Sequence, residues 1–183
     1  MNTTTHTLGK KFTNATPGLL ENTLLIHEEN LYSTNPEVSK IAADELANIG
    51  LLSVEILTKA LKSKINHVAK NAATGIKAIG PKAKSAVYGL TEMLQHSDTE
   101  CREIAAATLG VLRSTPDVSV QALAKALLED NELSVRQYAS AALGEFNGND
   151  LVKVIYVLQR AVKDDEKNVR EFAKYALSKS GAM

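Results

Sequence analysis

The chain repeats one pattern of apolar and polar positions five times. A motif of twelve residues, clearest in VRQYASAALGEF, begins at residues 38, 68, 101, 135 and 169, with spacings of 30, 33, 34 and 34 residues. An apolar residue stands seven positions before each start. Self-similarity at a fixed period of about 20–50 residues indicates a repeat architecture. The shared register therefore predicts five structural units.

Each motif has the spacing of an amphipathic helix. Its fifth residue is always alanine and its ninth is always aliphatic, and together with the first residue they lie on one helical face. The segment before each motif shows the same spacing, so each copy is predicted to be a hairpin of two helices. Capping residues before proline and glycines after helix ends mark the boundaries: Asn35-Pro36, Thr115-Pro116, Gly50, Gly80 and Gly148.

Ten helices without any strand-like alternation predict an all-α fold. Hairpins of this size stack side by side into an α-solenoid, in which each repeat contacts only its neighbours. We expect one solenoid domain over residues 16–183, preceded by a flexible polar tail at residues 1–15. The start of the chain does not resemble a secretory signal. The sequence contains no run of 18 apolar residues, the length that a membrane-spanning helix needs. A cytoplasmic location is therefore expected.

The motif also resembles a known family. The pattern L-x6-V-R-x2-A-x3-L-G, formed by residues 128–144, resembles HEAT repeats. The short period and the V-R, A-A and L-G pairs resemble the bacterial PBS lyase HEAT-like group, named after phycobilin lyase subunits. The resemblance covers residues 17–183 and is strongest in copies three to five. It implies five short HEAT-like hairpins whose second helices line a concave surface.

Candidate catalytic chemistry is sparse. The histidines have no metal-ligand spacing, and the His-Glu pairs of HEAT-repeat di-iron hydroxylases have no counterpart at the start of the second helices. Cys101 stands where the other copies have valine, so it is predicted to be a small buried apolar residue. We therefore expect no catalytic residue, no metal and no cofactor.

Charge is balanced overall and strongly banded along the chain. The sequence has 21 basic and 21 acidic residues. Residues 56–91 hold seven lysines and no acid, whereas residues 20–55 and 92–150 each carry a net charge of −6. In a solenoid such bands become spatial bands, so the lysine band is a candidate electrostatic docking surface for a protein. Nucleic acid is not favoured, because the band has no arginine and one aromatic residue.

The candidate binding surface follows from the family's orientation. We expect the third, sixth, seventh and tenth motif residues of the second helices to point outward, and copies three and four then present a smooth surface of small residues. Arg136 and Arg170 are expected to pair with acids in a ladder between repeats, whereas Arg102 lacks the acid five residues before its motif. The predicted protein-binding residues are Lys70, Lys77, Arg102, Glu103, Ala106, Ala107, Gly110, Arg136, Gln137, Ser140, Ala141 and Gly144.

The sequence therefore favours a non-enzymatic adaptor, scaffold or assembly factor that docks an acidic or amphipathic protein segment on its concave face. The family resemblance implies an alternative, a bilin lyase subunit or a phycobilisome assembly or turnover factor. Nucleic-acid binding is a third hypothesis. A homodimer through the C-terminal end is expected if Tyr156 or Tyr175 is exposed on an apolar end face.

Overall fold

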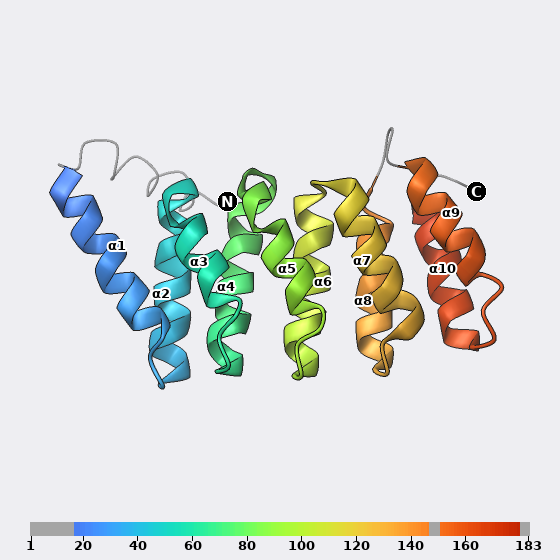
Figure 1. The fold of residues 1–183 in the computed structure, drawn as a ribbon, viewed down its shortest axis with the longest axis horizontal. Coiled ribbons are helices and arrows are strands. Elements are labelled where there is room, and N and C mark those ends of the chain that lie inside the picture. Colours follow the sequence, from blue (N-terminus) through green and yellow to red (C-terminus); the bar gives the residue numbers. More distant parts are fainter. Residues whose placement is uncertain (1–16, 147–150, 180–183) are drawn as a thin grey trace, which may run out of the picture. The chain divides into compact units, whose positions relative to one another are not determined.

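A computed structural model of the chain describes residues 17–146 and 151–179, which form helices joined by short loops (Figure 1). These described residues contain no strand, and the predicted all-α fold of five helical hairpins is confirmed. The predicted tail at residues 1–15 and Gly148 lie outside the described residues. The α-helices are α1 (Pro17–Leu31), α2 (Pro36–Ile49), α3 (Val54–Ala60), α4 (Asn66–Ile79), α5 (Val87–Met93), α6 (Thr99–Leu112), α7 (Pro116–Glu129), α8 (Leu133–Leu143), α9 (Leu151–Ala161) and α10 (Lys167–Lys179).

Two of the hairpins have a 3-10 helix before their first α-helix. η1 (Leu51–Ser53) precedes α3, and η2 (Gly80–Ala86) precedes α5. Gly50 and Gly80 lie just past the ends of α2 and α4, with φ of +86° and +76°. Side chains other than glycine rarely adopt such backbone angles. The two glycines therefore end the second helices where the sequence predicts.

The chain divides into two compact units, Met1–Ala86 (unit 1) and Val87–Met183 (unit 2). In unit 1, α2 packs against α1 and α4, and α3 packs against α4. In unit 2, the second helices α6, α8 and α10 pack in a row, and so do the first helices α5, α7 and α9. Figure 1 shows α7 and α9 in front of α8 and α10. The first and second helices of unit 2 thus form two layers.

The buried core follows the repeat positions that the sequence marks. The alanine at the fifth motif position and the aliphatic residue at the ninth are buried in all five copies. Leu109 and Leu143 are completely buried, and Leu177 is nearly so. At the first position, Val38 is exposed, whereas Val68, Cys101, Val135 and Val169 are buried. The register read from the sequence is therefore correct over the described residues.

The helix caps are only partly as predicted. The Asn35 side chain accepts a hydrogen bond of 2.9 Å from the Glu37 N–H and caps α2. Thr115, predicted to cap α7 in the same way, makes no capping hydrogen bond with its side chain. Its backbone is left-handed, with φ +48° and ψ +60°. A capping side chain needs an extended backbone to reach the first free N–H groups, so the prediction for Thr115 is wrong.

The left-handed backbone of Arg113, at the C-terminal end of α6, gives a testable prediction. Its φ is +45° and its ψ is +36°, and a residue with a Cβ atom is strained there. Arg113→Gly should raise the free energy of unfolding by about 1 kcal/mol, because glycine is the favoured residue at this position. Urea denaturation measures the change. The matched control is Lys125→Gly inside α7, which should lower the same free energy by about 1 kcal/mol.

Copy two departs from the repeat at Asn71 and Gly75, and packing explains both residues. The Asn71 Nδ2 group donates a hydrogen bond of 3.0 Å to the Ser39 hydroxyl of the preceding copy. A Cβ atom on Gly75 would lie 3.1 Å from the Ala43 carbonyl oxygen and 3.2 Å from the Leu57 side chain. These two residues therefore let α4 approach α2 closely and hold it there.

Candidate functional site

The second helices of unit 2 share a row of accessible residues at the third, fourth and seventh motif positions. Tyr138 retains 45% of its exposure and Tyr175 retains 59%, and the other members of the row are half-buried or exposed. We call this surface the second-helix face of unit 2. It consists of Glu103, Ile104 and Ala107 on α6, Gln137, Tyr138 and Ala141 on α8, and Glu171, Phe172 and Tyr175 on α10.

The sixth and tenth motif positions, predicted to point outward, are buried in copies three and four. Ala106, Ser140, Gly110 and Gly144 lie within the packing of unit 2. A Cβ atom on Gly110 would stand 2.9 Å from Ala142 of α8. The Ser140 hydroxyl donates a hydrogen bond of 2.5 Å to the Phe172 carbonyl. The placement of these four residues on an exposed surface is therefore wrong, because they let neighbouring second helices approach one another.

In copy five the sixth and tenth positions are not covered, because no helix follows α10 in the described part of the chain. Its sixth and tenth positions are Lys174 and Ser178, and both are exposed. Glu171 and Lys174 form an ion pair of 2.9 Å on α10. The terminal side of α10 is therefore polar at the positions where earlier copies carry small buried residues.

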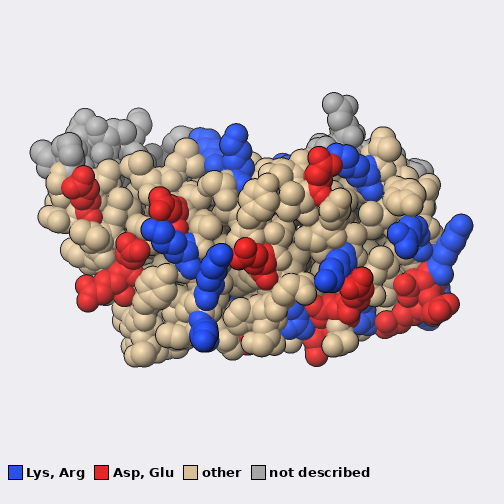
Figure 2. Space-filling model, in the orientation of Figure 1, with Lys and Arg blue, Asp and Glu red and all other residues tan. Residues whose placement is uncertain are grey.

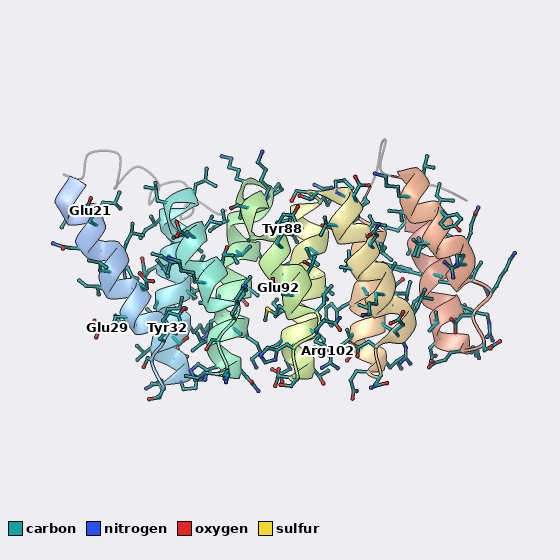
Figure 3. The ribbon with its side chains drawn as sticks, viewed as in Figure 1. Glu21, Glu29, Tyr32, Tyr88, Glu92 and Arg102 are labelled. Atoms are coloured by element: carbon teal, nitrogen blue, oxygen red, sulfur yellow. The ribbon has the colours of Figure 1, made fainter. Side chains whose placement is uncertain are left out.

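Arg102 has a strong acidic partner, contrary to the sequence prediction. Its Nε and Nη2 groups donate to the two carboxylate oxygens of Asp130, at 2.8 and 3.0 Å. Nη1 donates to the carbonyl of His96 at 2.9 Å. The hydrogen bonds to Asp130 raise the pKa of Arg102 above its ordinary value. The acid comes from the following copy and not from the preceding residues, so Arg102, near the N-terminal end of α6 (Figure 3), ties this helix to the loop before α8.

The three repeated arginines share one structural role. The Nη1 groups of Arg102, Arg136 and Arg170 each donate to the carbonyl six residues earlier, at 2.7–2.9 Å. Arg136 also pairs with Glu166 of the following copy at 2.5 Å and is buried. All three guanidinium groups therefore hold the hairpin loops, and those of Arg102 and Arg136 also link successive repeats. This leaves Arg102 and Arg136 with little capacity to bind a partner.

Lys70 and Lys77 belong to unit 1, and the other ten predicted binding residues belong to unit 2. Lys70 is half-buried and Lys77 is exposed, and the exposed Thr74 lies between them on α4. The spacing of seven residues puts both lysines on one face of the helix. The same third position carries the exposed Lys40 on α2 but Glu103 in unit 2, so the cationic character of this row belongs to unit 1.

No catalytic constellation was found in the described part of the chain. No group of three or more His, Cys, Asp or Glu side chains within it could hold a metal ion. Cys101 is buried on α6. A polar pocket between the α5–α6 and α7–α8 loops is lined by His96, Arg102, Lys125 and Asp130, but Arg102 and Asp130 are paired with each other. None of the described helices is long and apolar enough to cross a membrane.

The accessible apolar residues at the fourth motif position, one exposed and two half-buried, were not predicted as binding residues. They are Ile104, Tyr138 and Phe172 in unit 2. The sequence did hold a sign of them, because the fourth motif residue, three positions after the first, is apolar in all three copies of unit 2. Because the residues at the sixth and tenth positions pack against neighbouring second helices, those at the third, fourth and seventh positions face solvent. Glu103, Ala107, Gln137 and Ala141 do lie on this surface.

Tyr156 and Tyr175 are both exposed, but they lie on different layers of unit 2. Tyr175 belongs to the second-helix face, on α10, and Tyr156 lies on the first helix α9. The exposed residues Lys174 and Ser178 make the terminal side of α10 polar. A homodimer through the C-terminal end therefore stays a prediction, and the two tyrosines do not form one apolar end face.

Comparison with known proteins identifies the repeat type. Residues 27–110 match the family model of HEAT repeats. No curated protein matches the chain. An engineered protein of solved structure is similar at 26% sequence identity and a TM-score of 0.59, over 90% of this chain and 81% of that chain.

Two further solved structures share the fold. The complex of CpcE and CpcF of phycocyanin lyase from Nostoc sp. PCC7120 is similar at 21% identity and a TM-score of 0.64, over 87% of this chain and 65% of that chain. A designed armadillo repeat protein in complex with the peptide (KR)4 is similar at 18% identity and a TM-score of 0.60, over 85% and 81%. The chain thus has the α-solenoid fold of HEAT and armadillo-like repeat proteins, and its residues 27–110 match the HEAT-repeat model.

Proposed function

We propose that this protein is a non-enzymatic scaffold, acting as an adaptor or assembly factor that binds an amphipathic or acidic segment of another protein. One observation carries the proposal. Every second helix of unit 2 keeps an apolar residue at the fourth motif position, and packing does not bury it: Tyr138 is 45% exposed, and Ile104 and Phe172 are half-buried. An apolar row with a polar rim is typical of a surface that binds the apolar side of a partner segment.

The polar rim of this surface comes from the third motif position. Glu103, Gln137 and Glu171 stand one residue before the apolar row on α6, α8 and α10. Ala107 and Ala141 lie between the rim and the apolar row, and their small side chains leave room above the helices. The similarity to a designed armadillo protein that holds a peptide supports the same use of this fold.

In unit 1 we propose that Lys70 and Lys77 supply the contacts to an acidic part of the partner. Charged contacts of this kind set the association rate and its salt dependence more than the affinity. Lys70→Glu combined with Lys77→Glu should slow association at least about tenfold at low salt. The matched control is Lys82→Glu with Lys84→Glu in η2, which makes the same change of charge at two exposed residues of the same unit.

Affinity capture from the native cells with mass spectrometry tests the proposed function. Wild-type protein should capture a specific partner, and Ala107→Trp should abolish capture because the indole would cover the half-buried apolar row beside it. Ala107→Ser, which hardly changes the shape of the surface, should capture as the wild type does. Circular dichroism confirms the fold of each variant. Equal capture by Ala107→Trp and wild type would contradict binding on the second-helix face.

Gly144→Trp cannot serve as a second blocking variant. A Cβ atom at Gly144 would already lie 3.4 Å from the Ala176 backbone of α10, so an indole would separate α8 from α10. The residue that blocks the surface must come from the third, fourth or seventh position. Ala141→Trp meets this requirement and should behave as Ala107→Trp does.

A second candidate function is that of a bilin lyase subunit or of a phycobilisome assembly or turnover factor. It is favoured by the structural similarity to a chain of the CpcE and CpcF complex. An apolar row with two accessible tyrosines could contact the rings of a linear tetrapyrrole. A change in bilin absorbance on mixing that is lost in Tyr138→Ala would support this candidate, and an unchanged spectrum would leave the scaffold as the function.

A further inference from the structure

The first helix α9 exposes a face that neither the core nor the second-helix face uses. Val152 is 74% exposed and Tyr156 is 65% exposed. Arg160 is exposed farther along the helix, and Lys163 is exposed in the turn after it. Two successive spacings of four residues place Val152, Tyr156 and Arg160 on one face of α9. This face is therefore apolar over the first half of α9 and ends in a cation, Arg160.

A groove lies beside this face, between α7 and α9. It has a volume of about 520 Å³, and its apolar lining comes from Pro116, Val120, Val152, Tyr156 and Val157. Asp117 of α7 and Lys153 of α9 form an ion pair at its edge. The two helices also pack against each other within unit 2. The groove is thus formed before any partner binds.

α9 and the turn after it carry cations beside the groove. Lys153, Arg160 and Lys163 are the charged residues from 151 to 163, whereas the acids near them are Asp117 on α7 and Asp164, Asp165 and Glu166 after the turn. Lys153 is paired with Asp117, whereas Arg160 and Lys163 make no ion pair with any residue that the structure describes. Figure 2 shows Lys and Arg side chains next to Asp and Glu side chains at this end of unit 2. A partner that supplies carboxylates there would meet unpaired cations.

We propose that the α7–α9 groove binds an amphipathic helix of a partner protein, with apolar side chains in the groove and Asp or Glu over Arg160 and Lys163. A furrow between two packed helices matches the ridge of a third helix. A second copy of this chain is the rival occupant, and the oligomeric state tests it. In an isologous contact the one acid that lines the groove, Asp117, is already paired with Lys153 and would not be available to the facing Arg160.

Selection from a display library tests the proposal on the full chain. The library consists of helical peptides of about 18 residues, with Leu, Ile, Phe or Met on one face and Asp, Glu, Lys or Arg beside it. Selected peptides should be rich in Asp and Glu. Their affinity should fall about tenfold or more with Arg160→Glu and Lys163→Glu combined, because opposite charges become like charges. Binding should be lost in Tyr156→Ala, which removes an exposed side chain and should keep the wild-type melting temperature.

The same selection separates this proposal from the scaffold function. Peptides that bind the groove should tolerate Ala107→Trp, whereas peptides on the second-helix face should tolerate Tyr156→Ala. Selection of basic peptides, of no peptide, or only of peptides indifferent to Tyr156→Ala would overturn the groove proposal. So would sedimentation that shows a dimer of the wild type and a monomer of Tyr156→Ala, because a second copy would then cover the groove.

Discussion

Leu143→Ala is expected to lower the free energy of unfolding by about 2–5 kcal/mol. Leu143 is completely buried at the ninth motif position of α8, the helix that packs against α6, α7 and α10. Removing its side chain leaves a cavity where three helices meet, and the close packing around Gly110 and Gly144 limits how far the helices can collapse into it. Urea denaturation at constant temperature measures the loss.

The matched control for Leu143 is Leu133→Ala on the same helix. Leu133 is 42% exposed, so the same chemical change should cost below about 1 kcal/mol. A loss for Leu143→Ala as small as that of the control would mean that the ninth position does not face the core. The register that defines all five repeats would then be wrong.

Arg102→Ala is expected to lower the free energy of unfolding by about 3 kcal/mol, the low end of the range for breaking a buried ion pair. The side chains of Arg102 and Asp130 retain only 13% and 10% of their exposure. The alanine variant leaves the Asp130 carboxylate without its partner and frees the His96 carbonyl that Arg102 Nη1 holds. Both groups would be poorly hydrated in the folded protein.

Two controls separate the buried ion pair from general effects of charge. Lys174→Ala breaks the exposed pair with Glu171, whose side chains are 53% and 55% accessible, and should cost below about 1 kcal/mol. Arg102→Met combined with Asp130→Leu removes both charges and should recover most of the loss. A cost for Arg102→Ala no larger than that for Lys174→Ala would show that the pair does not link the repeats.

The fold could be predicted from the sequence because each repeat carries its own helical period. The first, fifth and ninth motif residues lie on one face whatever surrounds the helix, so the core row at Ala139 and Leu143 follows from spacing alone. The boundaries at Gly50 and Gly80 follow from the backbone angles that a helix end needs. These are local properties, and a single copy of the motif contains all of them.

The candidate surface could be predicted only in part, because it depends on which side of a second helix its neighbour covers. Spacing cannot tell whether Gly110 and Ser140 face solvent or the next helix, and the structure buries both. The same limit explains the error at Arg102. Its acid lies 28 residues later in the following repeat, and only the stacking of repeats brings the two together. Glu103 and Ala107 were placed correctly because they lie opposite the core row.

The central claim is that a partner segment lies on the second-helix face of unit 2, and site-specific photo-crosslinking tests it most directly. Benzoylphenylalanine would replace Tyr138, which is 45% exposed on α8, or Tyr88, which is 62% exposed on the first helix α5 (Figure 3). Both sites are exposed tyrosines, so the crosslinker replaces the same side chain at each, and residue 88 is the more accessible of the two. On irradiation in the native cells, the crosslinker at residue 138 should join the chain to one specific protein, and the crosslinker at residue 88 should not. Crosslinks from residue 88 with none from residue 138 would contradict the claim.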